Sequence, residues 1–176
     1  MMLHFAYGSN MNRMMMGWRC PTAQFEGCAV LPGHRFIIMR HGMATVVPAR
    51  GAVVYGVLWR LTPRDLAALN AYESIDTGLY RAVTRVVVAE RRRVSALVYE
   101  AGNRVRGRPK SGYMDVVTTA ARDVGLPPHY IRGLVRLAPV PPGRFAPAIP
   151  PRTAADVGGV SEDERPWQMI PARSSA

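Results

Sequence analysis

The chain is poor in the residues that build disulfide frameworks and metal sites. It has two cysteines in 176 residues, Cys20 and Cys28, and their spacing fits neither a Cys-x-x-Cys redox pair nor a zinc site. Its four histidines are scattered and match no helical metal-binding pattern. Two isolated thiols are typical of a reducing compartment, so we expect a cytoplasmic protein without a bound metal.

Long apolar runs and nucleotide-binding motifs are also absent. No stretch approaches the roughly 20 apolar residues of a membrane-spanning helix, and we expect no secretory signal at the first residues. The chain contains no Gly-x-x-x-x-Gly-Lys-Ser/Thr, Gly-x-Gly-x-x-Gly or Gly-x-Ser-x-Gly sequence. These absences argue against membrane insertion, phosphate-loop nucleotide binding and a nucleophilic serine elbow.

Lysine is nearly absent, since 22 of the 23 basic residues are arginines, yet the net charge is +11. Residues 140–176 carry equal numbers of basic and acidic side chains, and residues 81–110 hold nine basic and two acidic ones. Such a basic face attracts nucleic acid or an acidic partner, but its arginines are not interleaved with aromatic residues that stack on bases. We therefore expect a solvated basic surface, and not nucleic-acid binding as the main function.

The predicted organisation is one domain followed by a tail. A length of 176 residues with 48% hydrophobic residues suits a single globular domain with a real core. Eight of the 15 prolines lie beyond residue 138, and no hydrophobic periodicity accompanies them. We expect the domain over residues 1–138 and an irregular, Pro-rich tail over residues 139–176.

Hydrophobic periodicity predicts both strands and helices. Short apolar or alternating runs predict strands at residues 3–7, 34–40, 44–47, 52–61, 80–88 and 93–99. Pro48 is expected to end the third, and Gly56 in the fourth predicts a bulge or a close backbone approach. Thr62 and Pro63 predict the start of a helix, and helical spacing predicts two more, at residues 113–124 and after Pro127.

The stretch Tyr7-Gly8-Ser9-Asn10-Met11 connects the first predicted strand to a first helix. Apolar residues follow it at the spacing of one helix face: Met11, Met14, Met15 and Trp18. Glycine tolerates a positive φ in such a turn, and Ser9 or Asn10 would cap the helix by accepting its free N–H groups. The N–H groups and the helix dipole would seat a carboxylate or an oxyanion; an ordinary capped turn is the alternative.

Glu73 is the most informative single residue. It lies seven residues after Leu66 and four after Leu69, so it shares the apolar face of the helix that begins at Pro63. No lysine or arginine stands at helical spacing on that face, so burial would raise the pKa of the carboxyl toward the range of a general base. The alternative is that the helix frays before Glu73, which then meets solvent.

An ordered set of motifs across residues 3–137 resembles the γ-glutamylcyclotransferase family, which includes the AIG2-like proteins. The motifs follow the family's order: Tyr7-Gly8-Ser9-Asn10-Met11, Met43-Ala44-Thr45-Val46-Val47-Pro48, Val54-Tyr55-Gly56-Val57-Leu58-Trp59, Leu69-Asn70-Ala71-Tyr72-Glu73, Thr77-Gly78-Leu79-Tyr80 and Gly125-Leu126-Pro127-Pro128-His129-Tyr130. The resemblance implies an α+β fold in which a small mixed β-barrel is flanked by helices.

The resemblance also implies a reaction and a site. A γ-glutamyl amide is expected to close to 5-oxoproline and release its amine, with Glu73 as the acid/base and with no metal or cofactor. The γ-glutamyl group of this small-molecule substrate is expected to bind the family's loop residues, and a late tyrosine is expected to line the pocket. These binding residues are Tyr7, Gly8, Ser9, Asn10 and Tyr113.

The released amine stays open among an amino acid, a polyamine-like amine and an antibiotic precursor, as in the butirosin-pathway relative. The segment between Met39 and Met43, which borders the leaving group, is short, and the motif of the glutathione-specific branch is absent. A second hypothesis is a non-catalytic AIG2-like binding or regulatory protein with a basic interaction surface. A buried Glu73 carboxylate facing the Gly8-Ser9 loop would favour the enzyme.

Overall fold

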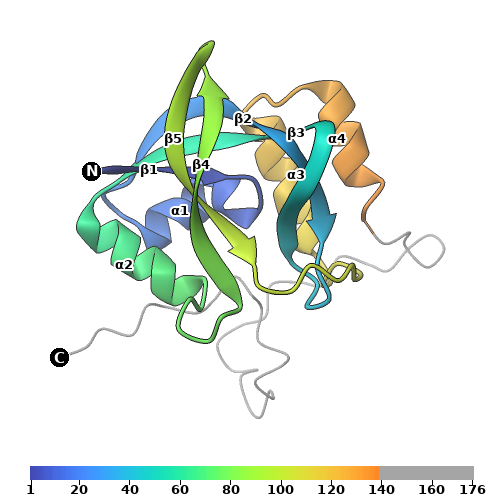
Figure 1. The fold of residues 1–176 in the computed structure, drawn as a ribbon, viewed down its shortest axis with the longest axis horizontal. Coiled ribbons are helices and arrows are strands. Elements are labelled where there is room, and N and C mark those ends of the chain that lie inside the picture. The colour runs from blue at the N-terminus through green and yellow to red at the C-terminus, as the bar shows by residue number, and fades with distance from the viewer. Residues whose placement is uncertain (139–176) are drawn as a thin grey trace.

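The computed structural model describes residues 1–138, which form a closed five-stranded barrel with four α-helices around it (Figure 1). The strands are β1 (Met2–Ala6), β2 (Gln24–Ile38), β3 (Ala44–Leu61), β4 (Tyr80–Ala89) and β5 (Arg92–Ala101). The helices are the 3-10 turn η1 (Ser9–Met11), α1 (Arg13–Arg19), α2 (Pro63–Tyr72), α3 (Tyr113–Asp123) and α4 (Pro128–Val135). The predicted α+β class, a small mixed barrel flanked by helices, is confirmed.

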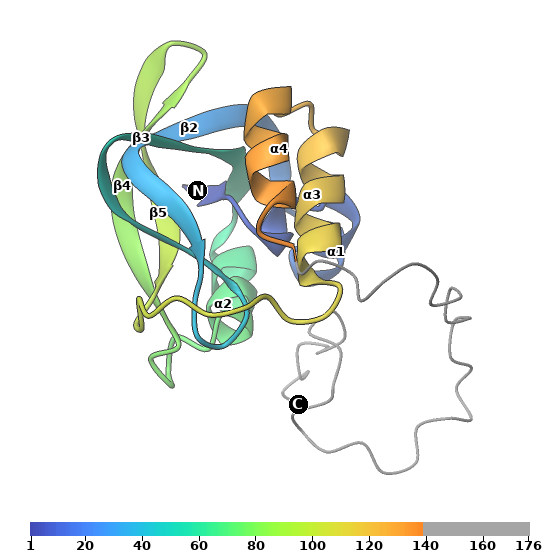
Figure 2. The ribbon, with the colours of Figure 1, turned by 90° about the vertical axis from the view of Figure 1, so that its right-hand side faces the viewer.

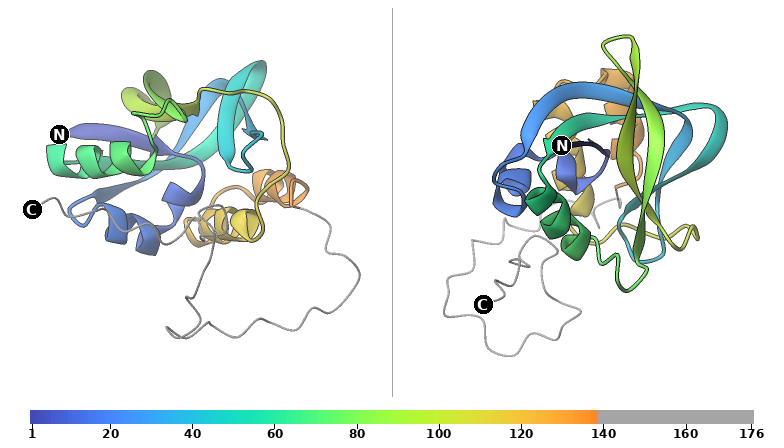
Figure 3. Two further views of the ribbon diagram at one scale, coloured as in Figure 1. Left: turned by 90° about the horizontal axis from the view of Figure 1, so that it is seen from below. Right: turned by 60° about the vertical axis from the view of Figure 1, so that its left-hand side comes forward.

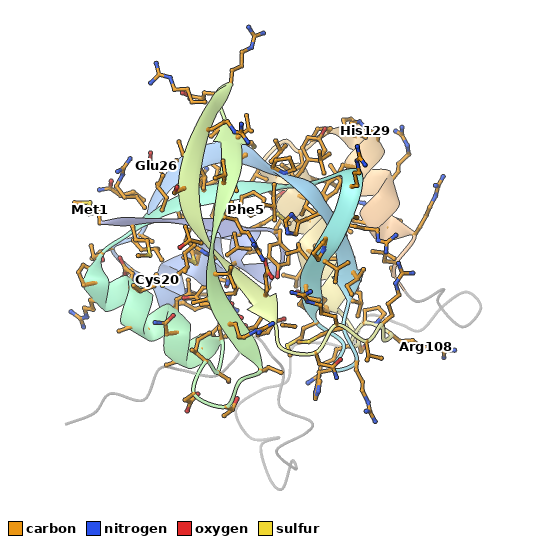
Figure 4. The ribbon with its side chains drawn as sticks, in the orientation of Figure 1. Met1, Phe5, Cys20, Glu26, Arg108 and His129 are labelled. Carbon is orange, nitrogen blue, oxygen red and sulfur yellow. The ribbon has the colours of Figure 1, made fainter. Side chains whose placement is uncertain are left out.

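The barrel is mixed because its first and last strands run parallel. The strand order is β1-β3-β2-β4-β5, and β1 closes the barrel by pairing antiparallel with β3 and parallel with β5. Buried apolar side chains fill it, and Figure 4 shows Phe5 at its centre while Met1, Glu26 and Arg108 lie at the periphery. Within residues 1–138, no helix has the length and apolar character needed to cross a bilayer.

The predicted division between the third and fourth strands, at residues 44–47 and 52–61, is wrong. Residues 44–61 form one strand, β3, which passes through Pro48 instead of ending there. Pro48 pairs with His34, beside a register shift between Pro32 and His34, and an irregular ladder of this kind tolerates a residue without an N–H group. β2 is also longer than predicted, because it begins at Gln24.

Gly56 marks a close approach of two strands, one of the two alternatives that its position predicted. A Cβ atom at this position would lie 2.2 Å from the carbonyl oxygen of Ala6 and 2.9 Å from the ring of Phe5. The register shifts of the β2–β3 ladder lie between Phe25 and Gly27 and between Pro32 and His34, whereas Gly56 pairs regularly with Ala29. Glycine here lets the end of β1 lie directly against β3.

The three later helices, α2, α3 and α4, begin where the sequence predicted. Thr62 caps α2 in a capping box with Asp65, and Pro63 occupies the first turn. Gly125, with a φ of 76°, follows α3, and α4 opens at Pro128. α3 and α4 lie side by side on one flank of the barrel (Figure 2), whereas α1 contacts α2 at another (Figure 3).

The β4–β5 hairpin projects beyond the rest of the molecule, and long side chains at its tip point away from the barrel (Figures 1 and 4). Glu90 and Arg91 form the turn with φ values of 47° and 63°. The predicted pair of antiparallel strands around this arginine-rich turn is confirmed. The predicted Pro-rich tail, residues 139–176, lies outside the described residues.

Candidate functional site

The loop after β1 is built differently from the predicted turn. Ser9–Met11 form the 3-10 turn η1, and the cap of α1 is Asn12, whose side chain accepts a 2.9 Å hydrogen bond from the N–H of Met15. The prediction that Ser9 or Asn10 caps the helix is therefore wrong. Because Asn12 serves as the cap, the side-chain amide of Asn10 is directed to other partners.

The same 3-10 turn changes the apolar face of the first helix. Met11 and Met15 are buried as the spacing predicted, but Met14 and Trp18 are 61% and 68% exposed. A 3-10 turn advances fewer residues per turn than an α-helix, so Met11 and the residues of α1 do not share one helical phase. The face of α1 that packs inward carries Met15 and Met16 instead.

Gly8 is needed for space and not for a positive φ, since its φ is −113°. A Cβ atom at Gly8 would lie 2.9 Å from the hydroxyl oxygen of Tyr113 and 3.4 Å from the Cβ of Ala44. That hydroxyl accepts a 3.1 Å hydrogen bond from the N–H of Ala44. Tyr113 of α3, the β1–η1 loop and the start of β3 therefore meet at van der Waals distance.

Glu73 lies directly after α2 and is buried. Its N–H donates to the carbonyl oxygen of Leu69 at 2.9 Å, and its Oε1 accepts a 2.7 Å hydrogen bond from Nδ2 of Asn10. Burial raises the pKa of Glu73 to about 7, although the Asn10 hydrogen bond and the charge of Arg19 lower it. The alternative in which Glu73 meets solvent is excluded by this burial.

One cavity of about 410 Å³ gathers all six residues that the sequence singled out. Glu73 lines it together with Tyr7, Gly8, Ser9, Asn10 and Tyr113. Tyr7 is held there by its hydroxyl, which donates to the carbonyl oxygen of Tyr99 at 2.5 Å. Burial raises the pKa of both Tyr7 and Tyr113, so both phenols stay protonated at neutral pH. These six residues thus combine one carboxyl, whose pKa lies near neutral pH, with neutral side chains and backbone groups.

Comparison with known proteins gives this arrangement a family context. The AIG2-like family matches residues 53–134. The chain is 28% identical to the γ-glutamylcyclotransferase of Bos taurus over 148 residues, which cover 78% of this chain and 79% of the relative. It is 27% identical to the Homo sapiens γ-glutamylcyclotransferase over the same length and shares. The chain thus resembles the γ-glutamylcyclotransferases.

Solved structures agree at the level of the fold. A γ-glutamyl cyclotransferase structure, 24% identical, superposes with a TM-score of 0.75 over 82% of this chain and 93% of its own. An uncharacterized protein from Homo sapiens, 25% identical, gives 0.74 over 84% and 94%. The resemblance predicted from the motifs is confirmed, and these relatives support an enzyme of the γ-glutamylcyclotransferase family.

Three residues of this γ-glutamylcyclotransferase-like site were missed by the sequence analysis. Arg19 donates from Nη1 to Oδ1 of Asn10 at 2.5 Å and from Nη2 to the hydroxyl of Tyr72 at 2.7 Å. Tyr72 and Lys110 line the cavity. Helical periodicity reveals only cations on the same helix as Glu73, whereas Arg19 belongs to α1.

The basic region of residues 81–110 lies mainly away from this cavity. Arg85 makes a two-point ion pair with Glu100, at 2.7 Å from Nε and 3.1 Å from Nη2, and Arg104 lies 3.5 Å from the same carboxylate. Arg91, Arg92 and Arg93 at the hairpin tip are exposed. Part of the basic excess therefore neutralises a buried carboxylate, and part is solvated.

Proposed function

We propose that the chain converts a γ-glutamyl amide into 5-oxoproline and a free amine, with Glu73 as general acid and base. The observation that carries this proposal is the Glu73 carboxyl, buried with a pKa near 7 in the same cavity as the Gly8-Ser9 loop. A group with a pKa near the working pH serves both to take and to return a proton. The relatives named γ-glutamylcyclotransferase support the same reaction class.

The proposed reaction is an intramolecular aminolysis. Glu73 takes a proton from the α-ammonium group of the γ-glutamyl moiety, and the freed amine attacks the γ-carbonyl carbon. The new C–N bond closes a five-membered lactam while the original amide C–N bond breaks. Glu73 transfers two protons in turn to the departing nitrogen: the one taken from the ammonium group and the one that the ring nitrogen loses after attack. The amine therefore leaves as an ammonium ion. Holding the γ-glutamyl chain bent supplies proximity, which contributes on the order of 7–11 kcal/mol in the best cases.

The other cavity residues have defined tasks in this proposal. The backbone N–H groups of the Gly8-Ser9 loop bind the α-carboxylate or the oxyanion that develops on the carbonyl. Tyr7, Tyr80, Tyr99 and Tyr113 form aromatic walls around the bent chain. Tyr80 is fixed because its hydroxyl donates to the carbonyl oxygen of Ala44 at 2.7 Å. Rigid walls keep the amine within attacking distance of the carbonyl.

The proposed leaving group is an amino acid, released with its own carboxylate. Among the described residues that line the cavity, Lys110 is the only lysine or arginine. It is exposed, and its N–H donates to the carbonyl oxygen of Gly42 at 3.0 Å, so its backbone is attached to the loop between β2 and β3. A cation in the lining of the cavity attracts a carboxylate and repels a cationic polyamine.

The test is 5-oxoproline formation by the full chain from a panel of γ-glutamyl amides of amino acids and of neutral and cationic amines. We expect turnover of the amino-acid amides and a loss of about 100-fold or more in Glu73→Gln, which keeps the shape but accepts no proton. Glu26→Gln is the matched control, because Glu26 is a partly exposed residue paired with Arg60 at 2.7 Å. An inactive panel, or normal turnover by Glu73→Gln, would contradict the proposal.

A further inference from the structure

We propose that Arg19 is a positioning residue for Glu73 and acts through the side-chain amide of Asn10. This inference deepens the proposed function, since it rests on the assignment of Glu73 as the proton-transferring group. It concerns a side chain that does not line the cavity and belongs to a helix, α1, outside the barrel.

Two hydrogen bonds in series connect Arg19 to Glu73. Nη1 of Arg19 donates to Oδ1 of Asn10 at 2.5 Å, and Nδ2 of the same amide donates to Oε1 of Glu73 at 2.7 Å. A guanidinium group can only donate hydrogen bonds, so it can bind Oδ1 of the amide but not the Nδ2 group, which is also a donor. Arg19 therefore fixes the orientation of the Asn10 amide with its NH₂ group toward the carboxylate.

Arg19 itself is held from several directions. Its guanidinium lies over the ring of Tyr72, with Cζ 3.8 Å from the centroid, and Nη2 donates to the Tyr72 hydroxyl at 2.7 Å. Cys20, which follows Arg19 and is labelled in Figure 4, donates from Sγ to the carbonyl oxygen of Asp65 in α2 at 3.4 Å. The end of α1 is thus attached to both ends of α2, next to the Glu73 backbone.

The fixed amide has a chemical consequence for Glu73. Because Oε1 accepts the Asn10 hydrogen bond, we assign the proton exchange with substrate to Oε2. A flipped amide would present Oδ1 to the carboxylate, and this contact would favour the protonated acid. Arg19 therefore keeps the carboxylate both oriented and ready to accept a proton.

The charge of Arg19 acts in the same direction. The titratable groups that interact electrostatically with Glu73 come from all sides: Arg19 of α1, Tyr72 of α2, Tyr7 near β1, Tyr80 of β4, Tyr99 of β5 and Tyr113 of α3. Burial raises the pKa of each of these phenols, so at neutral pH Arg19 is the charged member of the set. Without Arg19, only the Asn10 hydrogen bond opposes the effect of burial on the pKa of Glu73.

The test compares two arginine-to-methionine variants of α1 in the full chain. Arg19→Met removes the proposed contact. Arg13→Met is the matched control, because Arg13 is exposed on the same helix and lies over the ring of Phe25 at 3.9 Å. For Arg19→Met we expect the acid limb of the kcat/KM profile to move about one pH unit upward, with a loss of about fivefold at pH 7 that higher pH restores. Arg13→Met should leave the profile unchanged.

A second readout needs no turnover. The carboxyl carbon of Glu73, labelled with ¹³C, reports the titration of this group by NMR. Its signal is assigned as the one that is missing from the spectrum of Glu73→Gln. Its midpoint should rise in Arg19→Met and not in Arg13→Met, and this result would hold even if the wild-type chain formed no 5-oxoproline. If Arg19→Met does not fold, Arg19→Lys provides the test. It keeps the charge but cannot bind Asn10 and Tyr72 at the same time as the guanidinium does, so the Glu73 midpoint should rise by a smaller amount. An unchanged midpoint in the folded variant, or a loss of turnover that is equal at every pH, would overturn the proposal.

Discussion

The side-chain amide of Asn10 donates a 2.7 Å hydrogen bond to the carboxylate of Glu73, 63 positions later in the chain. The barrel brings the two residues together, because β1 ends just before Asn10 and pairs with β3, which leads directly into α2. Met2 pairs with Leu61 and Ala6 with Val57, so the register of one ladder sets the distance between the loop and the helix end. The carboxyl therefore remains buried only while the barrel is closed.

The first prediction is that Glu73→Gln stabilises the fold at high pH. Burial raises the pKa of Glu73 from its usual 4.5 to about 7, so the folded state holds this proton more tightly than the unfolded state. Below pH 4.5 the carboxyl is mostly neutral in both states and does not reduce the stability of the fold. As pH rises from 4.5 to 7, wild-type stability falls by about 1.4 kcal/mol per pH unit, or about 3 kcal/mol in all.

The glutamine side chain of the Glu73→Gln variant carries no charge at any pH, so the difference between the two proteins isolates this one group. The free energy of unfolding, measured in urea at pH 4 and pH 8, should be similar at pH 4 and higher for Glu73→Gln at pH 8. Other titrating groups, such as the buried His4, are common to both proteins and cancel. A difference that does not change with pH would show that the carboxyl is not buried as an acid.

Local signals in the sequence predicted much of the fold. The capping box of Thr62 and Asp65, the proline at position 63 and the glycine after α3 act within a few residues, so their effects are visible in the sequence itself. The burial of Glu73 was one of two alternatives that the sequence left open, because helical spacing from Leu69 placed it on the inward face only if the helix did not fray before it. Each of these features depends on neighbours in sequence.

Features that depend on distant partners were not predicted. Pro48 looked like a strand end, but pairing with His34 beside a register shift carries β3 through it. Met14 and Trp18 looked buried, but the 3-10 turn before Asn12 changed the helical phase. Arg19 reaches the Glu73 site only because the barrel places α1 against α2. The roles proposed for Glu73 and the loop residues remain predictions.

The second prediction uses two glycines of the same region with opposite surroundings. Gly8→Ala should destabilise the protein by about 1–3 kcal/mol, because its Cβ would lie 2.9 Å from the Tyr113 hydroxyl. Gly17→Ala, in α1 with nothing within 4 Å of the added Cβ, should stabilise it by roughly 0.5–1 kcal/mol. Urea unfolding measures both. Equal effects of the same sign would show that the space around Gly8 is not limiting.

The third prediction concerns Lys110 and the released amine. Lys110→Met should raise KM for a γ-glutamyl amino acid about tenfold, since one lost charge contact to a carboxylate is worth on the order of 1.5 kcal/mol. KM for the γ-glutamyl amide of a neutral amine of the same size should not change. Arg108→Met is the control, because Arg108 is an exposed cation of the same loop that does not line the cavity. Equal losses on both substrates would contradict a carboxylate-binding role.

The fourth prediction separates the cavity from the basic hairpin. Replacing Arg91, Arg92 and Arg93 together by serine should leave turnover of a γ-glutamyl amide unchanged. The tip lies one strand length from Tyr80, the residue at which β4 reaches the cavity, which is about 30 Å at 3.3 Å per residue. None of the three arginines lines the cavity, and all three are exposed.

The same variant tests whether the tip binds nucleic acid. A phosphate-binding surface would bind a random duplex at physiological salt, and its affinity would fall steeply as salt rises, because each phosphate contact releases counterions. For the wild-type chain we expect weak binding that disappears by about 150 mM salt, where exposed charges are screened beyond about 8 Å. Tight, salt-sensitive binding that the triple variant loses would assign the hairpin a function of its own. Lost turnover in a folded triple variant would instead link the tip to the cavity.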